Sequence, residues 1–291
     1  MTVNPQDLIE RLLPGARVAA CEPLTGGVSA EVLAVTVLRR DGEMQRLVVR
    51  RHRNLDGKPD RLERAAREFA LLERLHAAGV PVPEPHLFVA PDTLIQARIE
   101  GDTTLPPAAG PTMARVLAAI HDTDLADLPS LPVVDDPRPG LGEWLPESVN
   151  LAAVLDGIAP YAGRRALLHG DFWPGNLLWR NGELAAVLDW EDAAVGDPLV
   201  DVACARVELA CAAGDAMADA FSRAYFELTQ RDDARLPAWE LYVATAALRY
   251  MDGWGLTPDA LALRKARTQA CAAAAMQALG GAPPPEWSQQ D

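Results

Sequence analysis

The chain has 291 residues, of which 49% are apolar and 23% charged, as in a globular protein with one large domain or two modest ones. Its formal net charge of −14 lies entirely after residue 100, where 27 acidic residues accompany 13 basic ones, and this excess argues against nucleic acid as a partner. No apolar run is long enough to cross a bilayer, the N-terminus lacks a signal-peptide core, and the four cysteines lack CxxC spacing. We therefore expect a cytoplasmic protein without a membrane partner.

The first hundred residues are predicted to form a small mixed α/β unit. Two runs rich in β-branched residues flank an Asp41-Gly42 turn, which is typical of a hairpin. A helix with 3.6-residue periodicity follows, with arginines and glutamates on its polar face, and Gly79 ends it. The predicted elements are strands at 31–38 and 45–50, a helix at 61–78, and strands at 86–89 and 93–99.

The remaining residues are predicted to alternate helix with short strand. Glu100-Gly101 marks the expected boundary between the two parts, because the glycine allows a flexible link. A small β-rich part followed by a large α-rich part indicates an α+β protein with two lobes and a cleft between them. The predicted elements are a helix at 112–121, a loop at 128–139, short strands at 166–168, 177–179 and ending at 190, and mostly helix at 200–279.

Polar side chains that suit phosphoryl transfer gather between residues 166 and 201. A predicted strand leads to a loop with Asp171, and a hairpin follows with Asn176 at its start and Asp189 at its end. The hairpin would bring the Asn176 amide and the Asp189 carboxylate together, and such oxygens are the ligands that Mg²⁺ prefers. Asp171 could accept a hydrogen bond from a substrate hydroxyl. This set matches what transfer of a γ-phosphate requires.

The same run also carries a family resemblance. It reads H-G-D-x-x-x-x-N from His169 to Asn176, an apolar strand then ends in D-W-E from Asp189, and G-D-P-x-x-D follows. This pattern resembles the catalytic and metal-binding segment of the aminoglycoside phosphotransferase family, relatives of the choline kinases and protein kinases. The resemblance implies a two-lobed protein-kinase-like fold, with a β-rich nucleotide-binding lobe at 1–100 and a larger α-helical catalytic and substrate lobe at 101–291. It also implies ATP or GTP, Mg²⁺ and a small-molecule acceptor.

The resemblance assigns roles within the first hundred residues as well. Arg50 falls where the superfamily places the basic residue that holds the α- and β-phosphates, and Glu68 would orient it through an ion pair. Whether Arg50 or the adjacent Arg51 faces the phosphates stays open. A Gly-Gly segment before the first predicted strand would let backbone N–H groups approach phosphate, and 96–98 resembles the hinge that meets adenine. The residues assigned to the nucleotide are Gly26, Gly27, Ser29, Arg50, Glu68, Gln96 and Arg98.

Three neighbouring polar residues are interpreted as structural. His169 is expected to pack behind the loop and bond to backbone, because the family's histidine has that part. Asp197 and Asp201 are expected to anchor the loop and the following helix. The order and spacing of the motif, together with the resemblance, imply Asp171 as the catalytic residue, and Asn176 and Asp189 as the metal ligands.

The acceptor and the efficiency of transfer are open at this point. A cationic acceptor, such as an aminoglycoside or an amino alcohol, is mildly favoured by acidic residues near and after the site, whereas a carboxylate-bearing acceptor would require a basic pocket. One alternative is a kinase-like protein that binds nucleotide or metabolite without efficient transfer. Another is a hydrolase with a carboxylate–metal site. The oligomeric state is not predicted. These acidic residues include Glu191, Asp192, Glu208 and Asp252.

Overall fold

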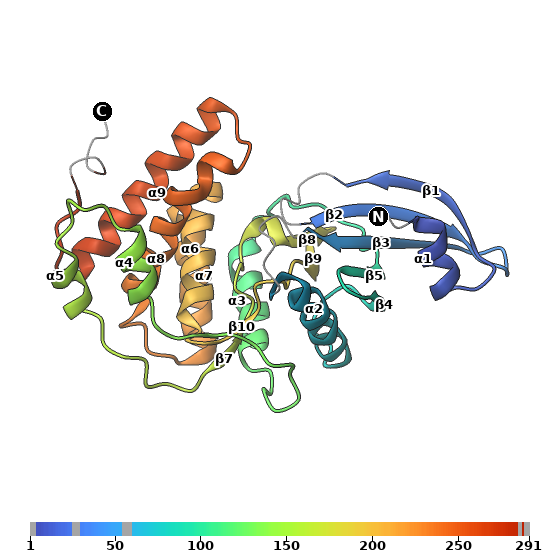
Figure 1. Cartoon of the computed structure of the whole chain (residues 1–291). Coiled ribbons are helices and arrows are strands. Elements are labelled where there is room, and N and C mark those ends of the chain that lie inside the picture. The colour runs from blue at the N-terminus through green and yellow to red at the C-terminus, as the bar shows by residue number, and fades with distance from the viewer. Residues whose placement is uncertain (1–3, 25–29, 54–59, 285–286, 288–291) are drawn as a thin grey trace. The chain divides into compact units, whose positions relative to one another are not determined.

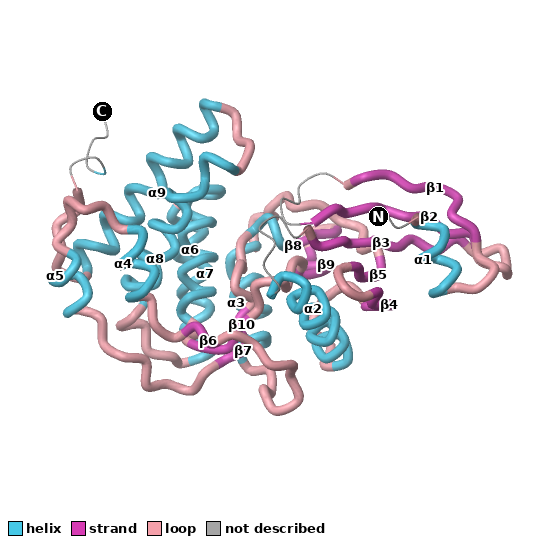
Figure 2. The backbone as a smooth tube through the Cα atoms, viewed as in Figure 1, coloured by secondary structure: helices cyan, strands magenta, loops and turns pink. Residues whose placement is uncertain are grey.

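The structure is a computed structural model that describes residues 4–24, 30–53, 60–284 and 287, without the side chains of 60–62. The chain falls into two compact units, a β-rich one and a helical one (Figures 1 and 2). The first holds the chain up to Asp102 with Ala126–Leu131 and Leu177–Asp192, and the second holds the rest. Among the described residues, none of the helices combines the length and apolar character that crossing a membrane needs.

The first unit is built on one antiparallel sheet with the strand order β1-β2-β3-β5-β4. The predicted hairpin is confirmed, since β2 and β3 pair along their whole length and Gly42 takes a φ of +86° in the turn between them. The elements of this part are α1 (Pro5–Leu12), β1 (Arg17–Pro23), β2 (Ala30–Leu38), β3 (Met44–His52), α2 (Asp60–Ala77), β4 (Pro85–Val89) and β5 (Thr93–Ala97).

Neither α1 nor β1 is among the predicted elements. Strand β1 lies at the edge of the sheet and most of its side chains are exposed, so it lacks the apolar alternation by which a strand is recognised. Helix α1 is short, but Asn4 caps it and Leu8 and Ile9 pack in the core beneath the sheet. The predicted strand at 93–99 is too long by two residues, because β5 ends at Ala97.

Helix α2 confirms the predicted helix at 61–78 within one residue at each end, and Gly79 ends it with a φ of +79°. Leu72 and Leu75 are buried on its inner face. Glu68 lies on this same face and is only 3% exposed, so its predicted position on the polar face is wrong. A buried carboxylate needs charged or hydrogen-bonding partners, and α2 therefore carries one polar group into the interior of the first unit.

A second hairpin, β8 (Leu177–Arg180) with β9 (Glu183–Val187), belongs to the first unit although its sequence position falls within 101–291. Its Asn181-Gly182 turn has positive φ at both residues, as a type I′ hairpin requires. The Val187 amide donates to the Pro81 carbonyl at 2.7 Å. The strand predicted to end at residue 190 ends at Val187, because Asp189 leaves the extended conformation with a φ of +63°.

The second unit consists mainly of packed helices with a small sheet of order β6-β10-β7. Helices α8 and α9 pack with α6 around a core that includes Leu241, Ala244 and Met276. The predicted helical region at 200–279 is confirmed, but the predicted loop at 128–139 contains β6, which pairs with β10 in parallel. The elements are α3 (Ala109–His121), β6 (Val133–Val134), α4 (Arg138–Trp144), α5 (Leu151–Asp156), β7 (Ala166–Leu168), η1 (Pro174–Asn176), β10 (Ala194–Gly196), α6 (Leu199–Ala213), α7 (Asp215–Thr229), α8 (Leu236–Tyr250), η2 (Met251–Gly253) and α9 (Pro258–Ala278).

Candidate active site

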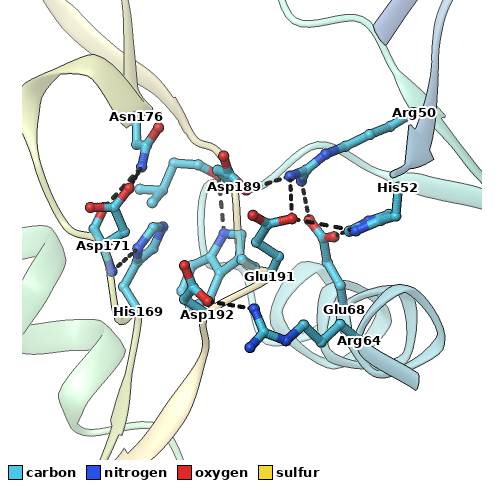
Figure 3. A network of polar contacts seen from close by, with 12 residues as sticks. Arg50, His52, Arg64, Glu68, His169, Asp171, Asn176, Asp189, Glu191 and Asp192 are labelled. Carbon is cyan, nitrogen blue, oxygen red and sulfur yellow. Dashed lines mark hydrogen bonds and ion pairs between the residues drawn. The ribbon is translucent and has the colours of Figure 1, made fainter. Parts of the chain in front are cut away.

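Arg50 is the centre of a charged cluster in the first unit (Figure 3). It lies near the end of β3 and is 7% exposed. Its Nη1 donates to Glu68 on α2 at 2.5 Å, and its Nη2 donates to Asp189 at 2.5 Å and to Glu191 at 3.2 Å. One arginine thus joins three carboxylates that come from α2 and from the segment after β9.

Arg51 points away from this cluster. Successive side chains of a strand alternate between the two faces of the sheet, so Arg50 and Arg51 lie on opposite faces. Arg51 donates from Nε to Asp92 at 3.2 Å and is half-buried. Arg50, and not its neighbour, therefore faces the carboxylates of this cluster.

His52 is the second cation of the Arg50 cluster, because it lies two residues further along β3 and so shares the face of Arg50. Its Nε2 is 2.8 Å from Glu68 Oε2, and its Nδ1 is 3.3 Å from Glu191 Oε2. Neither His52 nor the pairing of Glu191 was predicted. Strand alternation places His52 on the same face as Arg50, and Glu191 follows Asp189 by two residues. No sequence pattern, however, predicts that His52 and Glu191 lie together.

Electrostatics favour the charged forms of the cations in this cluster. Burial lowers the pKa of His52, but hydrogen bonds with Glu191 and Glu68 outweigh it and raise that pKa to about 9. Burial likewise opposes the Arg50 charge, yet the carboxylates raise the pKa of Arg50 above its ordinary value. The pKa of Glu68 is lowered, because Arg50 and His52 outweigh its burial. The pKa of Asp189 is raised, since its burial outweighs the attraction of Arg50.

In the second unit, the loop after β7 is held by buried hydrogen bonds. The Asp201 carboxylate accepts from the backbone N–H of His169 at 2.7 Å and of Gly170 at 2.9 Å. It also lies 3.1 Å from His121 Nε2, whose ring is bonded through Nδ1 to the Tyr225 hydroxyl at 2.7 Å. Gly170 has a φ of +86°, which suits glycine at this sharp turn. The predicted anchoring role of Asp201 agrees with these contacts.

His169 and Asp197 also have the structural surroundings that were predicted for them. His169 is fully buried, and its Nδ1 accepts from the Asp171 backbone N–H at 3.2 Å. The Asp197 carboxylate accepts from the Leu199 backbone N–H and from the Trp239 indole N–H. These bonds hold the backbone at Asp171 and at Leu199. Asp171 is the acidic side chain of the H-G-D motif.

Asn176 orients Asp171 through its amide group. Its Nδ2 donates to the Asp171 carboxylate at 3.0 Å and to the Asp171 carbonyl at 2.9 Å (Figure 3). Both donated bonds leave from the nitrogen, so the Asn176 Oδ1 is the atom available as a metal ligand. In the described parts of the chain, no three His, Cys, Asp or Glu side chains form a ready-made metal site. The Asn176 Oδ1 nevertheless suits Mg²⁺, because this ion needs only one or two protein oxygens as ligands.

The other predicted nucleotide residues are less informative. Gln96 lies in β5, where it pairs with Val48, and is half-buried. Arg98 follows the strand and lies 3.4 Å from Glu22. Neither residue contacts the Arg50 cluster among the bonds of the described residues. Three further predictions, Gly26, Gly27 and Ser29, fall on residues outside those that the structure describes.

Comparison with known proteins identifies the family. The model of the phosphotransferase enzyme family matches residues 20–239, and the chain belongs to this family. Acyl-CoA dehydrogenase family member 11 of Gallus gallus is 31% identical over 171 residues. The match covers 47% of this chain but only 22% of that protein, so the chain corresponds to a small part of its curated relative.

Two solved structures of similar fold are phosphotransferases by name. Macrolide 2′-phosphotransferase MphH of Brachybacterium faecium has a TM-score of 0.62 at 23% identity, covering 90% of this chain and 97% of that chain. A thermostable mutant of aminoglycoside phosphotransferase APH(4)-Ia, in a ternary complex with AMP-PNP and hygromycin B, has a TM-score of 0.60 at 21% identity, covering 93% and 98%. These likenesses confirm the predicted kinase-like α+β fold.

Proposed function

We propose that the chain transfers the γ-phosphate of ATP, or of GTP, to a hydroxyl group of a small molecule. The observation that carries the proposal is the bond from Arg50 to the buried Glu68. A basic residue on the third strand, paired with a glutamate on the next helix, is the arrangement by which kinase-like enzymes hold nucleotide phosphates. The AMP-PNP complex of a structural neighbour supports a nucleotide as the donor.

In this proposal the first hundred residues bind the nucleotide. Arg50 would contact the α- and β-phosphates, and Glu68 would fix its guanidinium from the buried side. The backbone of Gly26, Gly27 and Ser29 would cover the phosphates, while the segment from Gln96 to Arg98 would meet the base. Arginine suits this role because its planar fork can bind two phosphate oxygens at once.

Residues 101–291 would supply the catalytic base and receive the acceptor. Asp171 would accept the proton from the acceptor hydroxyl as the oxygen attacks the γ-phosphorus, while the leaving oxygen stays on the nucleoside diphosphate. Asn176 would keep the Asp171 carboxylate in one orientation through the bond from its Nδ2. A fixed orientation matters because effective catalysis requires the reacting groups to lie in near-attack geometry.

The Asn176 Oδ1 and the Asp189 carboxylate would hold Mg²⁺. The bound ion would neutralise charge on the phosphate oxygens. The Asp189 carboxylate also accepts a hydrogen bond from Arg50. We infer that the phosphates and Asp189 compete for Arg50, so nucleotide binding rearranges the Arg50 cluster.

The charges around the site give no support to a cationic acceptor. Glu191 bonds to Arg50, and Asp192 lies 3.1 Å from Arg64. Glu208 bonds to Arg264 and Asp252 to Lys265. Each of these four acidic residues therefore has a basic partner. In this proposal, other side chains of the second unit select the acceptor.

A second candidate function is nucleotide or metabolite binding without efficient transfer. The direct bond between Arg50 and Asp189 favours it, because the carboxylate proposed for the metal already has a cationic partner. The two functions differ in their response to metal. An enzyme should bind nucleotide more tightly with Mg²⁺, whereas a binding protein that keeps the Arg50–Asp189 bond should not.

The experiment that tests the proposal is ADP release from Mg·ATP over a panel of acceptor alcohols, with Asp189→Ala run in parallel. We expect acceptor-dependent release by the natural chain and none by the variant, which should still show a cooperative unfolding transition. Full activity of Asp189→Ala would contradict the assignment. Binding of Mg·ATP without release by any acceptor would favour the second candidate function.

A further inference from the structure

One face of α6 leads away from the loop that carries Asp171. Asp201, Cys204 and Glu208 are spaced by three and four residues, so they share this face. Asp201 holds the loop itself, and Glu208 lies about 10 Å further along the helix axis. The buried Cys204 lies between them: its pKa is raised first by burial and then by the charges of Asp171 and Glu208. The face thus connects the proposed base with Glu208.

Glu208 holds an arginine at the end of this face. Glu208 is 7% exposed and accepts a hydrogen bond from Nη2 of Arg264, near the start of α9. The Arg264 guanidinium lies 5.0 Å from the ring centroid of Trp254, a distance at which a cation and an aromatic ring attract each other. Arg264 is therefore fixed from two sides.

Most of the hydrogen-bonding capacity of Arg264 is unused. An arginine carries five N–H donors. Among the described residues, Nη2 bonds to Glu208, Nη1 makes no hydrogen bond, and Nε is buried without a partner. A buried donor without a partner is unusual in a folded protein and indicates a missing partner nearby. Arg267, one turn further along α9, differs because its Nη1 donates to the Cys211 carbonyl.

Apolar side chains are exposed in the segments of the chain that lead up to Arg264. They belong to the end of α8, to the loop between η2 and α9, and to α9 itself, and each of them exposes more than a third of its surface. We call this set the apolar rim. Exposed apolar side chains that gather beside a polar group commonly mark a ligand site. The apolar rim consists of Tyr250 (53% exposed), Trp254 (40%), Leu256 (37%) and Leu263 (56%).

We propose that the acceptor of the phosphotransferase is a hydroxy carboxylate with an apolar part. Its carboxylate would bind Arg264, its apolar part would pack on Trp254 and the apolar rim, and its hydroxyl would reach toward Asp171. This inference rests on the proposed function, since it names the substrate class of the same site. Arg264 is then a specificity-determining residue, and Glu208 is the positioning residue that orients it.

Charge balance favours a carboxylate over a cation or a phosphate group. Glu208 is buried and already bonded to Arg264, so an ammonium group would have to displace a guanidinium from it. A doubly charged phosphate would meet one arginine whose charge is partly balanced by Glu208. A single carboxylate needs only the free donors of Arg264, and a planar guanidinium matches its two oxygens.

The test compares three alcohols that share a phenylpropane skeleton: phenyllactate, phenylalaninol and the neutral phenylpropanediol. Calorimetry measures their binding to the full chain, and ADP release from Mg·ATP is followed in parallel. We expect phenyllactate to bind most tightly of the three. Arg264→Gln should weaken its binding about 10- to 100-fold, the effect of losing a charged hydrogen bond. Arg267→Gln is the matched control on the same helix and should change binding less than twofold.

The outcomes separate this inference from the proposed function. Binding of phenyllactate that depends on Arg264, without ADP release by any alcohol, would leave the carboxylate site standing and contradict transfer. ADP release with phenylalaninol or the diol as the preferred acceptor would support transfer and overturn the inference. Equal binding by Arg264→Gln and Arg267→Gln, or no binding of phenyllactate at millimolar concentration, would also overturn it. Unfolding temperatures of both variants show whether each is folded.

Discussion

The two polar centres of the molecule are held in different ways. The Arg50 cluster of the first unit is made of charges, with Arg50 and His52 set against Glu68, Asp189 and Glu191. The loop of Asp171 in the second unit is held by buried hydrogen bonds to backbone N–H groups. Ion pairs can exchange partners when a charged ligand arrives, whereas a backbone anchored by a buried carboxylate keeps its shape. We infer a nucleotide site that rearranges and a catalytic loop that is fixed beforehand.

The largest effect is expected in the fixed loop. Asp171→Asn keeps the size of the side chain but removes the base, so ADP release should fall by about 100- to 10,000-fold. The free energy of unfolding, measured in urea, should change by less than about 1 kcal/mol, because Asp201 anchors the backbone of the loop and the substitution keeps the size of the side chain. A variant that loses stability together with activity would show that Asp171 is part of the anchor.

In the charged cluster, removing a carboxylate should reduce stability. Glu68→Ala leaves Arg50 and His52 buried with fewer counter-charges, and we expect a loss of roughly 3 to 5 kcal/mol in the free energy of unfolding. Glu73→Ala on the exposed side of the same helix is the matched control and should change it by less than about 0.5 kcal/mol. Equal losses in both variants would mean that the cluster does not stabilise the first unit.

His52 gives the cluster a pH dependence that the loop should lack. Its pKa in the folded chain, about 9, lies above its ordinary value of 6.5. Its contribution to stability is therefore complete below pH 6.5 and is lost as the pH rises through 9. The difference in unfolding free energy between the natural chain and His52→Gln should shrink by up to about 3 kcal/mol over this range. Parallel pH profiles of the two proteins would contradict the charged state of His52.

The smallest effect is expected for Arg51, the neighbour on the other face of β3. Its ion pair with Asp92 is partly exposed, so Arg51→Gln should cost less than about 1 kcal/mol. Affinity for Mg·ATP, measured by calorimetry, should be unchanged, whereas Arg50→Gln should weaken it at least tenfold through the loss of a charged hydrogen bond. If Arg51→Gln weakens nucleotide binding as much as Arg50→Gln, the assignment of the inward arginine is wrong.

The sequence predicts local features better than the pairing of distant residues. The β2–β3 and β8–β9 hairpins and helix α2 follow from turn residues and periodicity, and the order of Asp171, Asn176 and Asp189 indicates the family. Glu191 is 141 residues from Arg50, and no local pattern predicts their bond. Strand β1 is hidden for a different reason, since an exposed edge strand has no apolar alternation.

The choice between charge partners is also beyond the sequence. The acidic residues that suggest a cationic acceptor are visible in the sequence, but their basic partners are not. Arg264 lies 56 residues from Glu208, and only the packing of α9 against α6 joins them. A count of charges therefore misjudges the character of a site whenever the charges are paired in the folded chain.

The central claim is transfer of phosphate to an alcohol, and phosphorus NMR of the reaction tests it most directly. The chain is incubated with Mg·ATP and the acceptor alcohols, and the fate of the γ-phosphate is followed. Transfer predicts a new phosphate monoester signal that grows with ADP and is absent in Asp171→Asn. Growth of inorganic phosphate alone would indicate a hydrolase. Binding of ATP without any decrease of the ATP signals would indicate a binding protein. Either result would contradict the claim.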